Sequence, residues 1–340
     1  MEPDGGVLVD RASFKGKDYI STADWSVEEL GEALDVSKEL KAAFRNNEPH
    51  RLLPDKTLFM IFLDLSTRTR NAFEAGMTQL GGHAHFIDAG TSQIAHGEAP
   101  RDMGIILGSY GHGIAIRHDK VPGEGNAYMR EVAAAAEVPI INLQCDIDHP
   151  TQQIADLMTI EEHFGTRDLS GMKICVSWAF APSYAKPMSV PQGLALLLPR
   201  FGAELTIARP PEFRLQTGVM EQAHELAAEG GGSIVEVEDM DAGFEGATVV
   251  YPKSWGAEHL FGKEQEALAL NARYKDWICD SRRMGIAAKD SIYMHCLPAD
   301  RGNEVTDEVI DGEQSVVFQE AENRLHTGKA LMALTMGGYA

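Results

Sequence analysis

The sequence has few cysteines, no long hydrophobic run and little positive charge. Its four cysteines, at positions 145, 175, 279 and 296, show no CxxC spacing, which argues against a zinc ribbon or a redox motif. We expect reduced thiols in a cytoplasmic protein. No apolar stretch approaches the roughly 18 residues of a membrane-spanning helix, so a membrane partner is not expected. The first residues are acidic and lack the apolar core of a signal peptide.

Positive charge is scarce, because 30 basic residues face 51 acidic ones and the formal net charge is −21. A protein of this charge is not expected to bind nucleic acid. The sequence also lacks the GxxxxGK[ST] signature of phosphate-binding loops. Gly123-Glu124-Gly125 lacks the third glycine of a dinucleotide fingerprint, which argues against an NAD-linked oxidoreductase. We therefore expect neither a cofactor nor a metal ion.

The pattern that is present predicts an α/β protein of two domains, each built on a doubly wound parallel sheet. The 340 residues exceed one ordinary domain, and short β-rich runs alternate with helical patterns. We place the domains at residues 1–150 and 151–320, and a C-terminal helix at 321–340 that packs back on the first domain. Strands are expected at residues 57–63, 84–88, 113–118, 138–142, 172–178, 203–208, 233–237, 247–251, 291–295 and 315–318. Helices are expected from a capping box at Ser26-Val27-Glu28-Glu29 to Phe44, from Thr151 to Phe164 and from Glu320 to Met336.

The most informative stretch of the chain is Ser66-Thr67-Arg68-Thr69-Arg70. It follows a predicted buried strand and opens a predicted helix, whose N–H groups and positive dipole end favour an anion. Arginine adds a planar fork of donors that suits phosphate oxygens. The plain alternative is a helix start with one solvated arginine. Two arginines and three hydroxyls at one junction favour phosphate binding over it.

Four further polar segments follow predicted strands at the point where each strand ends. They are Arg117, Asp146 to Gln152, Lys253-Ser254-Trp255 and His295-Cys296-Leu297-Pro298. In open α/β sheets the carboxyl ends of the strands line the ligand crevice. We therefore expect these segments to contribute to a ligand site.

Each of these residues also has a structural interpretation when it is taken alone. His149 is typical of a helix-capping segment, and a metal site with Cys145 and Asp146 would lack a full ligand set. Cys296 is by default a small buried hydrophobe. Arg324, near acidic neighbours in the last predicted helix, is by default half of a solvated ion pair.

Together with Glu322-Asn323-Arg324, these motifs resemble the aspartate and ornithine carbamoyltransferases, in which they occur in the same order. The resemblance runs from about Asp18 to Leu334. Lys253-Ser254-Trp255-Gly256 stands where ornithine enzymes carry a Ser-Met-Gly segment, so the chain is similar to the knotted branch that includes N-acetylornithine carbamoyltransferase. Within that branch it resembles a subgroup of carbamoyltransferases with unassigned acceptors. The shared stretches are Gly125 to Glu131, Gln144 to Pro150 and Ser183 to Gln192.

The resemblance implies a carbamoyl phosphate domain over 1–150 and an acceptor domain over 151–320, the second with a trefoil knot, a rare exception to unknotted connections. It also implies a role for individual residues. The phosphate would be held by Ser66, Thr67, Arg68 and Thr69. The carbonyl oxygen would be polarised by Thr69, Arg117 and His149. The carbamoyl NH₂ would be held by Gln152 and the carbonyls around Cys296 and Leu297, with Arg324 near the same end.

A loop like Ser92 to Glu98, which includes Gln93, reaches into the neighbouring subunit's site in this family. The resemblance therefore implies a homotrimer with sites at subunit interfaces. The sequence departs from the family pattern at His96, where many relatives have lysine or arginine. A titratable imidazole there weakens the fixed positive charge of the loop. A second departure is the stretch from Trp178 to Ser183, which lacks the asparagine that grips ornithine, so ornithine itself is not expected as acceptor.

Lysines are the candidates for binding an acceptor carboxylate. The first is Lys253, with Ser254 and Trp255 beside it, and the second is Lys186. The alternative for each is an ordinary surface lysine.

The resemblance implies a carbamoyltransferase that moves the carbamoyl group from carbamoyl phosphate to a primary amine of an amino-acid-like acceptor and releases phosphate. Fixed donors aimed at the oxygen of the tetrahedral intermediate would supply much of the stabilisation. N-acetylornithine carbamoyltransferase is the alternative within this class. A non-catalytic relative that senses carbamoyl phosphate or another anion is the alternative outside it.

Overall fold

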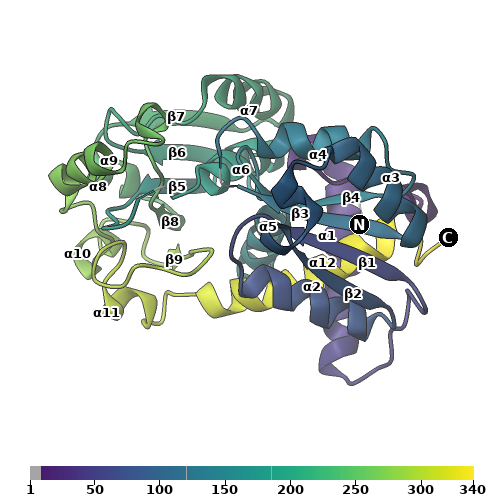
Figure 1. Ribbon diagram of the computed structural model, residues 1–340. Helices are drawn as coiled ribbons and strands as arrows, with labels where there is room; N and C mark the ends of the chain where they lie inside the picture. Colours follow the sequence, from purple (N-terminus) through teal and green to yellow (C-terminus); the bar gives the residue numbers. More distant parts are fainter. Residues whose placement is uncertain (1–8, 120, 185) are drawn as a thin grey trace. The chain divides into compact units, whose positions relative to one another are not determined.

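The computed structural model describes residues 9–119, 121–184 and 186–340, which form two compact units (Figure 1). One unit extends to Ala155 and resumes at Glu322, and the other comprises Asp156–Ala321. Both divisions fall inside helices, namely α5 (Pro150–Phe164) and α12 (Val317–Thr335). Among the described residues, no helix is both long and apolar enough to cross a membrane.

The first unit is built on a parallel sheet with the strand order β2-β1-β3-β4. Its strands are β1 (Thr57–Phe62), β2 (His83–Asp88), β3 (Gly113–His118) and β4 (Ile140–Cys145). These are the four strands predicted for the first half, with β4 lying slightly later than expected. Because β2 and β3 flank β1 on opposite sides, the strand order reverses there. A ligand crevice is expected outside the carboxyl ends of strands at such a reversal.

Helices cover this sheet on both sides (Figure 1). They include α1 (Val27–Arg45), α2 (Arg68–Gln79), α3 (Pro100–Tyr110) and α4 (Gly125–Ala133). The predicted capping box of α1 is confirmed, since Ser26 and Glu29 exchange side-chain to backbone hydrogen bonds. Met103 of α3 and Met129 of α4 pack with Ile61, Ile114 and Ile140 of the sheet in one buried hydrophobic cluster.

The start of α4 shows why the chain needs glycine where a dinucleotide motif was considered. A Cβ on Gly125 would lie 1.8 Å from the carbonyl oxygen of His118, so only glycine fits between α4 and the end of β3. Gly123 adopts a positive φ of +85° in the turn before it. The stretch is therefore a turn leading into a helix.

The second unit has a five-stranded parallel sheet with the order β7-β6-β5-β8-β9. Its strands are β5 (Lys173–Trp178), β6 (Glu204–Ala208), β7 (Ser233–Val237), β8 (Val249–Lys253) and β9 (Ile292–Tyr293). Its helices are α6 (Ser189–Leu197), α7 (Thr217–Gly230), α8 (Met240–Phe244), α9 (Glu264–Asn271), α10 (Ser281–Met284) and α11 (Asp307–Ile310). The order reverses between β5 and β8, so the ends of these two strands flank a second switch point.

One predicted strand is wrong and another is shorter than expected. Residues 315–318 form no strand, because Ser315 makes only an isolated bridge to Tyr293 and α12 already begins at Val317. A short apolar run such as Val316-Val317-Phe318 does not distinguish a strand from the first turn of a helix. The strand predicted over 291–295 shrinks to two residues, Ile292 and Tyr293. The trefoil knot stays a prediction.

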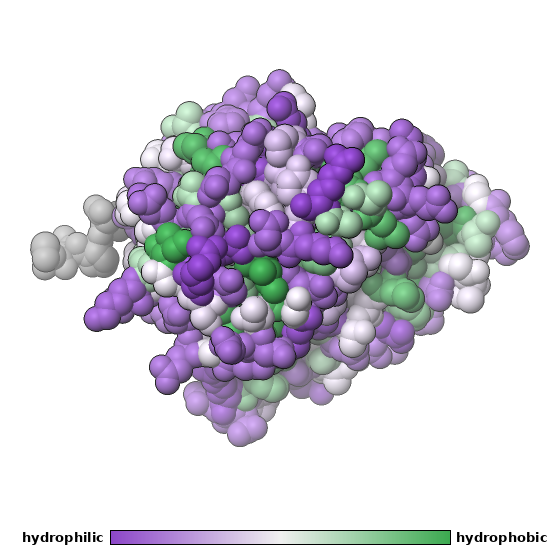
Figure 2. Space-filling view, turned by 90° about the vertical axis from the view of Figure 1, so that its left-hand side faces the viewer, coloured by the Kyte–Doolittle hydropathy of each residue, from purple (hydrophilic) through white to green (hydrophobic). Residues whose placement is uncertain are grey.

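The surface is mostly polar on the face that Figure 2 shows, and its hydrophobic residues lie in small separate groups. Cys145, Cys175, Cys279 and Cys296 are all free thiols, the first three of them buried.

Candidate active site

The Ser66–Arg70 stretch lies at the junction of β1 and α2, as predicted. The helix begins at Arg68, and Thr67 is its N-cap residue but makes no side-chain capping hydrogen bond. An end that is not capped by its own side chain keeps its affinity for an anion. Burial increases over three of these residues, from an exposed Thr67 through a half-buried Arg68 to Thr69, which is 2% exposed.

Arg324 of α12 joins this stretch to α5. Its Nη2 donates to Oγ1 of Thr69 at 2.8 Å, and its Nη1 donates to Oε1 of Gln152. The arginine is only 3% exposed, so the solvated ion pair considered for it from sequence is wrong. The two bonds hold the guanidinium in place between α2 and α5.

Arg117 lies at the end of β3, and a carboxylate that the sequence analysis missed holds it. Its Nε and Nη2 donate to the two oxygens of Asp119 at 3.0 and 2.9 Å. The Asp119 side chain is fully buried. Burial raises the pKa of Asp119, and the charge of Arg117 opposes this rise. A carboxylate two residues after a strand-end arginine is the signal that would have found this pair.

His149 is the last residue before α5 and is 4% exposed. Burial lowers its pKa well below the usual value, and the positive charges of Arg324, Arg117 and Arg68 lower it further. The imidazole is therefore neutral at neutral pH. A neutral imidazole carries one N–H donor, which suits a carbonyl oxygen that gains negative charge.

The remaining predicted donor residues of this unit are more exposed. Gln93 opens the 3₁₀ turn η4 (Gln93–His96), and its Oε1 lies 3.3 Å from Nδ1 of His96. Arg70 stacks on Phe86, with 3.6 Å between its guanidinium carbon and the ring centroid. Together with Ser66, it lines a pocket of about 300 Å³ at the ends of β1 and β2. The two arginines of the stretch therefore have different surroundings.

In the second unit, the His295–Pro298 segment follows β9 and has a constrained backbone. Leu297 has a positive φ of 52°, which is unusual for a leucine, and its peptide bond to Pro298 is cis. The N–H of Leu297 donates to Nδ1 of His295 at 2.8 Å. Cys296 between them is half-buried. Burial raises the pKa of its thiol, but His295 and Lys253 outweigh burial and lower the pKa below its usual value.

Glu304 organises this segment, and nothing in the sequence drew attention to it. Its Oε1 accepts the backbone N–H of Ser254 and its Oε2 that of Asp300, both at 2.7 Å. Nζ of Lys253 lies 3.7 Å from Oε1, and Nε2 of His295 lies 3.4 Å from Oε2. Burial raises the pKa of Glu304, but Lys253 and His295 outweigh it and lower the pKa well below the usual value.

The candidate acceptor residues are largely engaged within the protein. Lys253 is 6% exposed and, besides its pairing with Glu304, donates to the carbonyl of Ser254 at 2.8 Å. Trp255 is 1% exposed, and its indole N–H donates to the carbonyl of Phe213 at 2.9 Å. Lys186 is less buried and forms a 3.1 Å ion pair with Asp300. Of these side chains, Lys186 is the one with the more accessible charge.

No metal site emerges in the part of the chain that the structure describes, where no three histidine, cysteine or acidic side chains are grouped to hold an ion. The cysteine nearest to His149 in sequence, Cys145, is fully buried, and burial raises the pKa of its thiol to about 12. A protonated thiol is a poor metal ligand.

Comparisons with known proteins relate both halves of the chain to one family. Residues 17–162 match the model of the aspartate/ornithine carbamoyltransferase carbamoyl-P binding domain, and residues 186–335 match that of the Asp/Orn binding domain. A protein of Escherichia coli K12 named "Putative carbamoyltransferase YgeW" is 39% identical over an alignment that covers 90% of this chain and 86% of that protein.

Solved structures of the same family have the same fold. The ornithine carbamoyltransferase from Pyrococcus furiosus superposes with a TM-score of 0.86 at 36% identity, covering 97% of this chain and 99% of that one. An acetylornithine transcarbamylase complexed with acetylcitrulline superposes with a TM-score of 0.85 at 32% identity, covering 93% of this chain and 98% of that one.

Proposed function

The chain belongs to the aspartate/ornithine carbamoyltransferase family, and we propose that it transfers the carbamoyl group of carbamoyl phosphate to a primary amine of an amino-acid-like acceptor, releasing phosphate. One observation carries this proposal. In a protein of net charge −21, three arginines from three different elements, Arg68, Arg117 and Arg324, act on the same neutral imidazole of His149. Such a concentration of positive charge around one hydrogen-bond donor suits a phosphate bonded to a carbonyl.

We assign the phosphate to the start of α2. The backbone N–H groups of its first turn and the side chains of Ser66, Thr67, Arg68 and Thr69 are its donors. Thr69 already accepts a hydrogen bond from Arg324. Its own hydroxyl proton therefore remains available to a ligand oxygen, since a hydroxyl donates one bond and accepts others.

We assign the carbonyl oxygen to Thr69, Arg117 and His149. Attack of the neutral amine on the carbamoyl carbon forms a tetrahedral intermediate with negative charge on this oxygen, and the bond to phosphate then breaks. The departing phosphate takes the proton that the amine loses. Donors that are fixed before the reaction stabilise this charge, and the loss of one typically costs about 2.7–4 kcal/mol of barrier. Asp119 fixes Arg117 for this task through two hydrogen bonds.

The carbamoyl NH₂ is assigned to Gln152 and to the backbone carbonyls around Cys296 and Leu297. Arg324 supports this assignment, because it donates to Oε1 of Gln152 and thereby fixes the orientation of the amide. Cys296 acts through its backbone in this scheme and not as a nucleophile. The residues before 156 thus form the carbamoyl phosphate domain, and the second unit forms the acceptor domain.

For the acceptor's carboxylate we favour Lys186 over Lys253. The ion pair of Lys186 with Asp300 is partly exposed, so a ligand carboxylate can take the place of Asp300 at small cost. Lys253 is held against the buried Glu304, and its release would leave that carboxylate without its cation. Ser254 and Trp255 then shape the acceptor pocket without binding through their polar atoms.

We also propose a cytoplasmic homotrimer. The first unit exposes Ile105, Ile106 and Tyr110 of α3 to 45%, 46% and 69%. A group of exposed apolar side chains on one helix is typical of a protein interface. The exposed turn that contains Gln93 and His96 is the segment we assign to the neighbouring subunit's site.

A second candidate function is N-acetylornithine carbamoyltransferase. It is favoured by the Lys253–Gly256 segment, which differs from the Ser-Met-Gly segment of ornithine enzymes, and the fold is compatible with it. A non-catalytic anion sensor is disfavoured by Asp119, since orienting Arg117 serves catalysis more than binding.

The test is an incubation of the protein with carbamoyl phosphate and a panel of amines, with phosphate release and ureido product measured together. We expect turnover that depends on one amino-acid-like amine, with equal amounts of both products. Ready turnover of N-acetylornithine would establish the second candidate. Binding of carbamoyl phosphate without turnover of any amine in a broad panel would favour the sensor. No binding at all would refute the proposal.

A further inference from the structure

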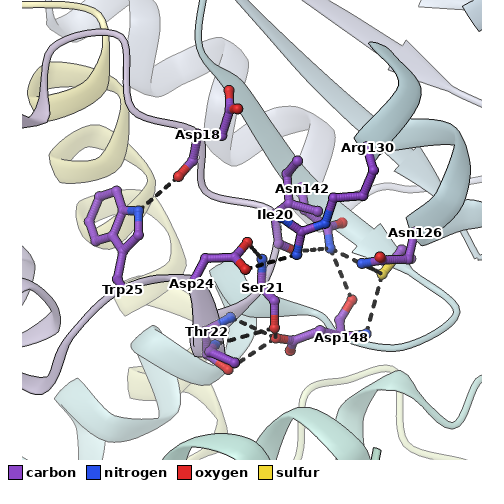
Figure 3. A network of polar contacts seen from close by, with 12 residues as sticks. Asp18, Ile20, Ser21, Thr22, Asp24, Trp25, Asn126, Arg130, Asn142 and Asp148 are labelled. Carbon is purple, nitrogen blue, oxygen red and sulfur yellow. Dashed lines mark hydrogen bonds and ion pairs between the residues drawn. The ribbon is translucent and has the colours of Figure 1, made fainter. Parts of the chain in front are cut away.

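A buried network joins the N-terminal segment 18–25 to the turn that carries His149 (Figure 3). Its centre is Asp148, which is fully buried and directly precedes His149 in the chain. Oδ2 of Asp148 accepts three hydrogen bonds, from Oγ of Ser21 at 2.9 Å and from the backbone N and Oγ1 of Thr22 at 2.8 and 3.0 Å. One carboxylate oxygen thus connects segments about 126 residues apart.

The same turn is held at its other atoms as well. Nδ2 of Asn142 donates to the carbonyl of Ile20 at 2.6 Å and lies 3.2 Å from Sγ of Cys145. The backbone N–H of Asp148 donates to Sγ of Cys145 at 3.3 Å. In return, the backbone N–H of Cys145 donates to the carbonyl of Asp148 at 2.9 Å. The hydroxyl of Tyr19 donates to the carbonyl of Pro150 at 3.3 Å. Both sides of His149 are therefore tied to the N-terminal segment.

A buried carboxylate at this position carries a free-energy cost, because burial disfavours its charged form. Burial raises the pKa of Asp148 to about 6, even though Ser21 and Thr22 stabilise the ionised form. A neutral amide or hydroxyl would avoid that cost. A charged acceptor, however, forms stronger and shorter hydrogen bonds than a neutral one. The choice of a carboxylate suits a turn that has to be held rigidly.

We propose that Asp148 is a positioning residue for His149, which anchors the turn to Ser21 and Thr22 so that the imidazole donor meets the carbamoyl oxygen in the correct place. This inference rests on the proposed function. It gives the N-terminal segment 18–25 a role in the reaction, although we assign none of its residues to the binding of carbamoyl phosphate. A donor displaced by about 1 Å can lower a rate by about 100-fold.

The charged state of Asp148 should then control the rate. The titratable groups of its own turn are Cys145, Asp146 and His149. On the other side lie Asp18 and Asp24 of the N-terminal segment and Arg130 of α4, which pairs with Asp24 at 2.8 Å (Figure 3). Cys145 stays protonated because burial raises the pKa of its thiol to about 12, and His149 stays neutral because its pKa is lowered. Asp148 is therefore the group of this turn expected to titrate near pH 6. Protonation weakens the three hydrogen bonds, so kcat should fall as the pH drops through this value.

The experiment compares kcat and the KM for carbamoyl phosphate in the wild type, Asp148→Asn and Thr22→Val between pH 5 and 8. Both substitutions conserve shape, and Oδ1 of Asp148, the atom that asparagine would replace with NH₂, makes no hydrogen bond within the described residues. Arg130→Gln is the matched control, since it removes an exposed ion pair of the same segment without touching Asp148. The substrate titrates in the same way with every variant. The ratio of the wild-type kcat to that of Asp148→Asn at each pH therefore reports the effect of the Asp148 carboxyl group alone.

We expect Asp148→Asn to lower kcat roughly tenfold at pH 8 and to remove the acid limb near pH 6, with the KM for carbamoyl phosphate changed less than threefold. Thr22→Val should lower kcat roughly threefold and keep the limb, and Arg130→Gln should change neither. A folded Asp148→Asn with wild-type kcat and the wild-type acid limb would overturn the proposal. So would a loss that appears only in KM.

A second measurement does not depend on turnover. The ring signals of His149 in ¹⁵N-histidine NMR spectra can be assigned from their loss in His149→Gln. We expect them to shift in Asp148→Asn and Thr22→Val but not in Arg130→Gln, and unshifted signals would refute the positioning role. If the wild type turns over no amine, the proposed function fails while this measurement still decides whether Asp148 positions His149.

Discussion

His149 in the first unit and His295 in the second are buried histidines among the candidate site residues, and the two have opposite surroundings. His149 of the first unit is acted on by three arginines, which together with burial lower its pKa. His295 of the second unit faces Glu304, whose negative charge outweighs burial and raises the pKa of that histidine. The first imidazole is neutral among positive charges, and the second belongs to a group in which opposite charges are paired.

This difference indicates what each unit is built to do. The first unit gathers positive charge around His149, since Arg68, Arg117 and Arg324 all act on its imidazole. Arg324 bonds the neutral groups of Thr69 and Gln152, and Arg117 is oriented by Asp119. The second unit pairs its cations internally, Lys253 with Glu304 and Lys186 with Asp300. A charged donor substrate suits the first arrangement. An acceptor that must lose a proton to react suits the second, because little net charge is exposed to it.

The largest effect on ligand binding is expected when one of the arginines of the first unit is removed. Arg68→Ala should abolish carbamoyl phosphate binding in calorimetry and leave the melting temperature unchanged, because Arg68 is only half-buried. Two charge-assisted hydrogen bonds are worth about 3–6 kcal/mol together. Arg101→Ala, an exposed arginine of the same unit, is the control and should bind normally. Unchanged affinity in Arg68→Ala would contradict the assignment of the phosphate to α2.

The second prediction concerns the paired charges of the second unit. Glu304→Gln should destabilise the protein by about 3–5 kcal/mol in urea unfolding, because it removes one partner of a buried ion pair and leaves Lys253 without its carboxylate. Glu313→Gln is the control on an exposed carboxylate and should change the free energy of unfolding by less than about 0.5 kcal/mol. A Glu304→Gln protein as stable as the control would show that the second unit does not depend on this pairing.

The sequence predicts these two regions unequally, for a physical reason. Ser66 to Arg70 could be located because a strand, a helix start and phosphate donors follow one another in the chain. Glu304 lies 50 residues from Ser254, which it bonds, and no periodicity links them. Asp148 is similarly remote from Thr22. Partners that meet only through folding leave no local pattern, whereas the strands and helices that carry them do.

Two buried carboxyl groups, one in each unit, should give opposite dependences of stability on pH. The folded pKa of Asp148 is raised from 3.8 to about 6, so its contribution to stability is present below pH 4 and is lost as the pH rises through 6, about 3 kcal/mol in all. The folded pKa of Glu304 is lowered, so its contribution is present above its ordinary pKa and is lost as the pH falls below about 4.5.

Urea unfolding of the wild type, Asp148→Asn and Glu304→Gln at a series of pH values tests both signs. Asp148→Asn should remove the loss of stability between pH 4 and 6. Glu304→Gln should weaken the loss at lower pH. A wild-type slope near pH 5 that survives in Asp148→Asn would assign that slope to another group.

A smaller effect is expected at Arg117. Asp119→Asn keeps the shape of the buried side chain but replaces the bidentate carboxylate with an amide that accepts at one atom. The guanidinium is then less firmly oriented toward the carbamoyl oxygen. We expect kcat to fall roughly tenfold, which corresponds to about 1.4 kcal/mol of barrier. Asp102→Asn on the exposed side of α3 is the control, and equal kcat values in the two variants would remove Asp119 from the reaction.

The smallest change in stability is expected at Lys186. Its ion pair with Asp300 is partly exposed, so Lys186→Met should cost at most about 1 kcal/mol in urea unfolding, and Lys263→Met, on an exposed lysine, should cost still less. The same variant should nevertheless raise the KM for the acceptor roughly tenfold and leave the KM for carbamoyl phosphate unchanged.

Lys253→Met should instead lose stability, because it leaves Glu304 buried without its cation. If Lys186→Met leaves the acceptor KM unchanged, the acceptor carboxylate is not bound by the more accessible lysine. Lys253 would then have to release Glu304 and bind the acceptor carboxylate instead. The ion pair between Lys253 and Glu304 would in that case exist only in the absence of the acceptor.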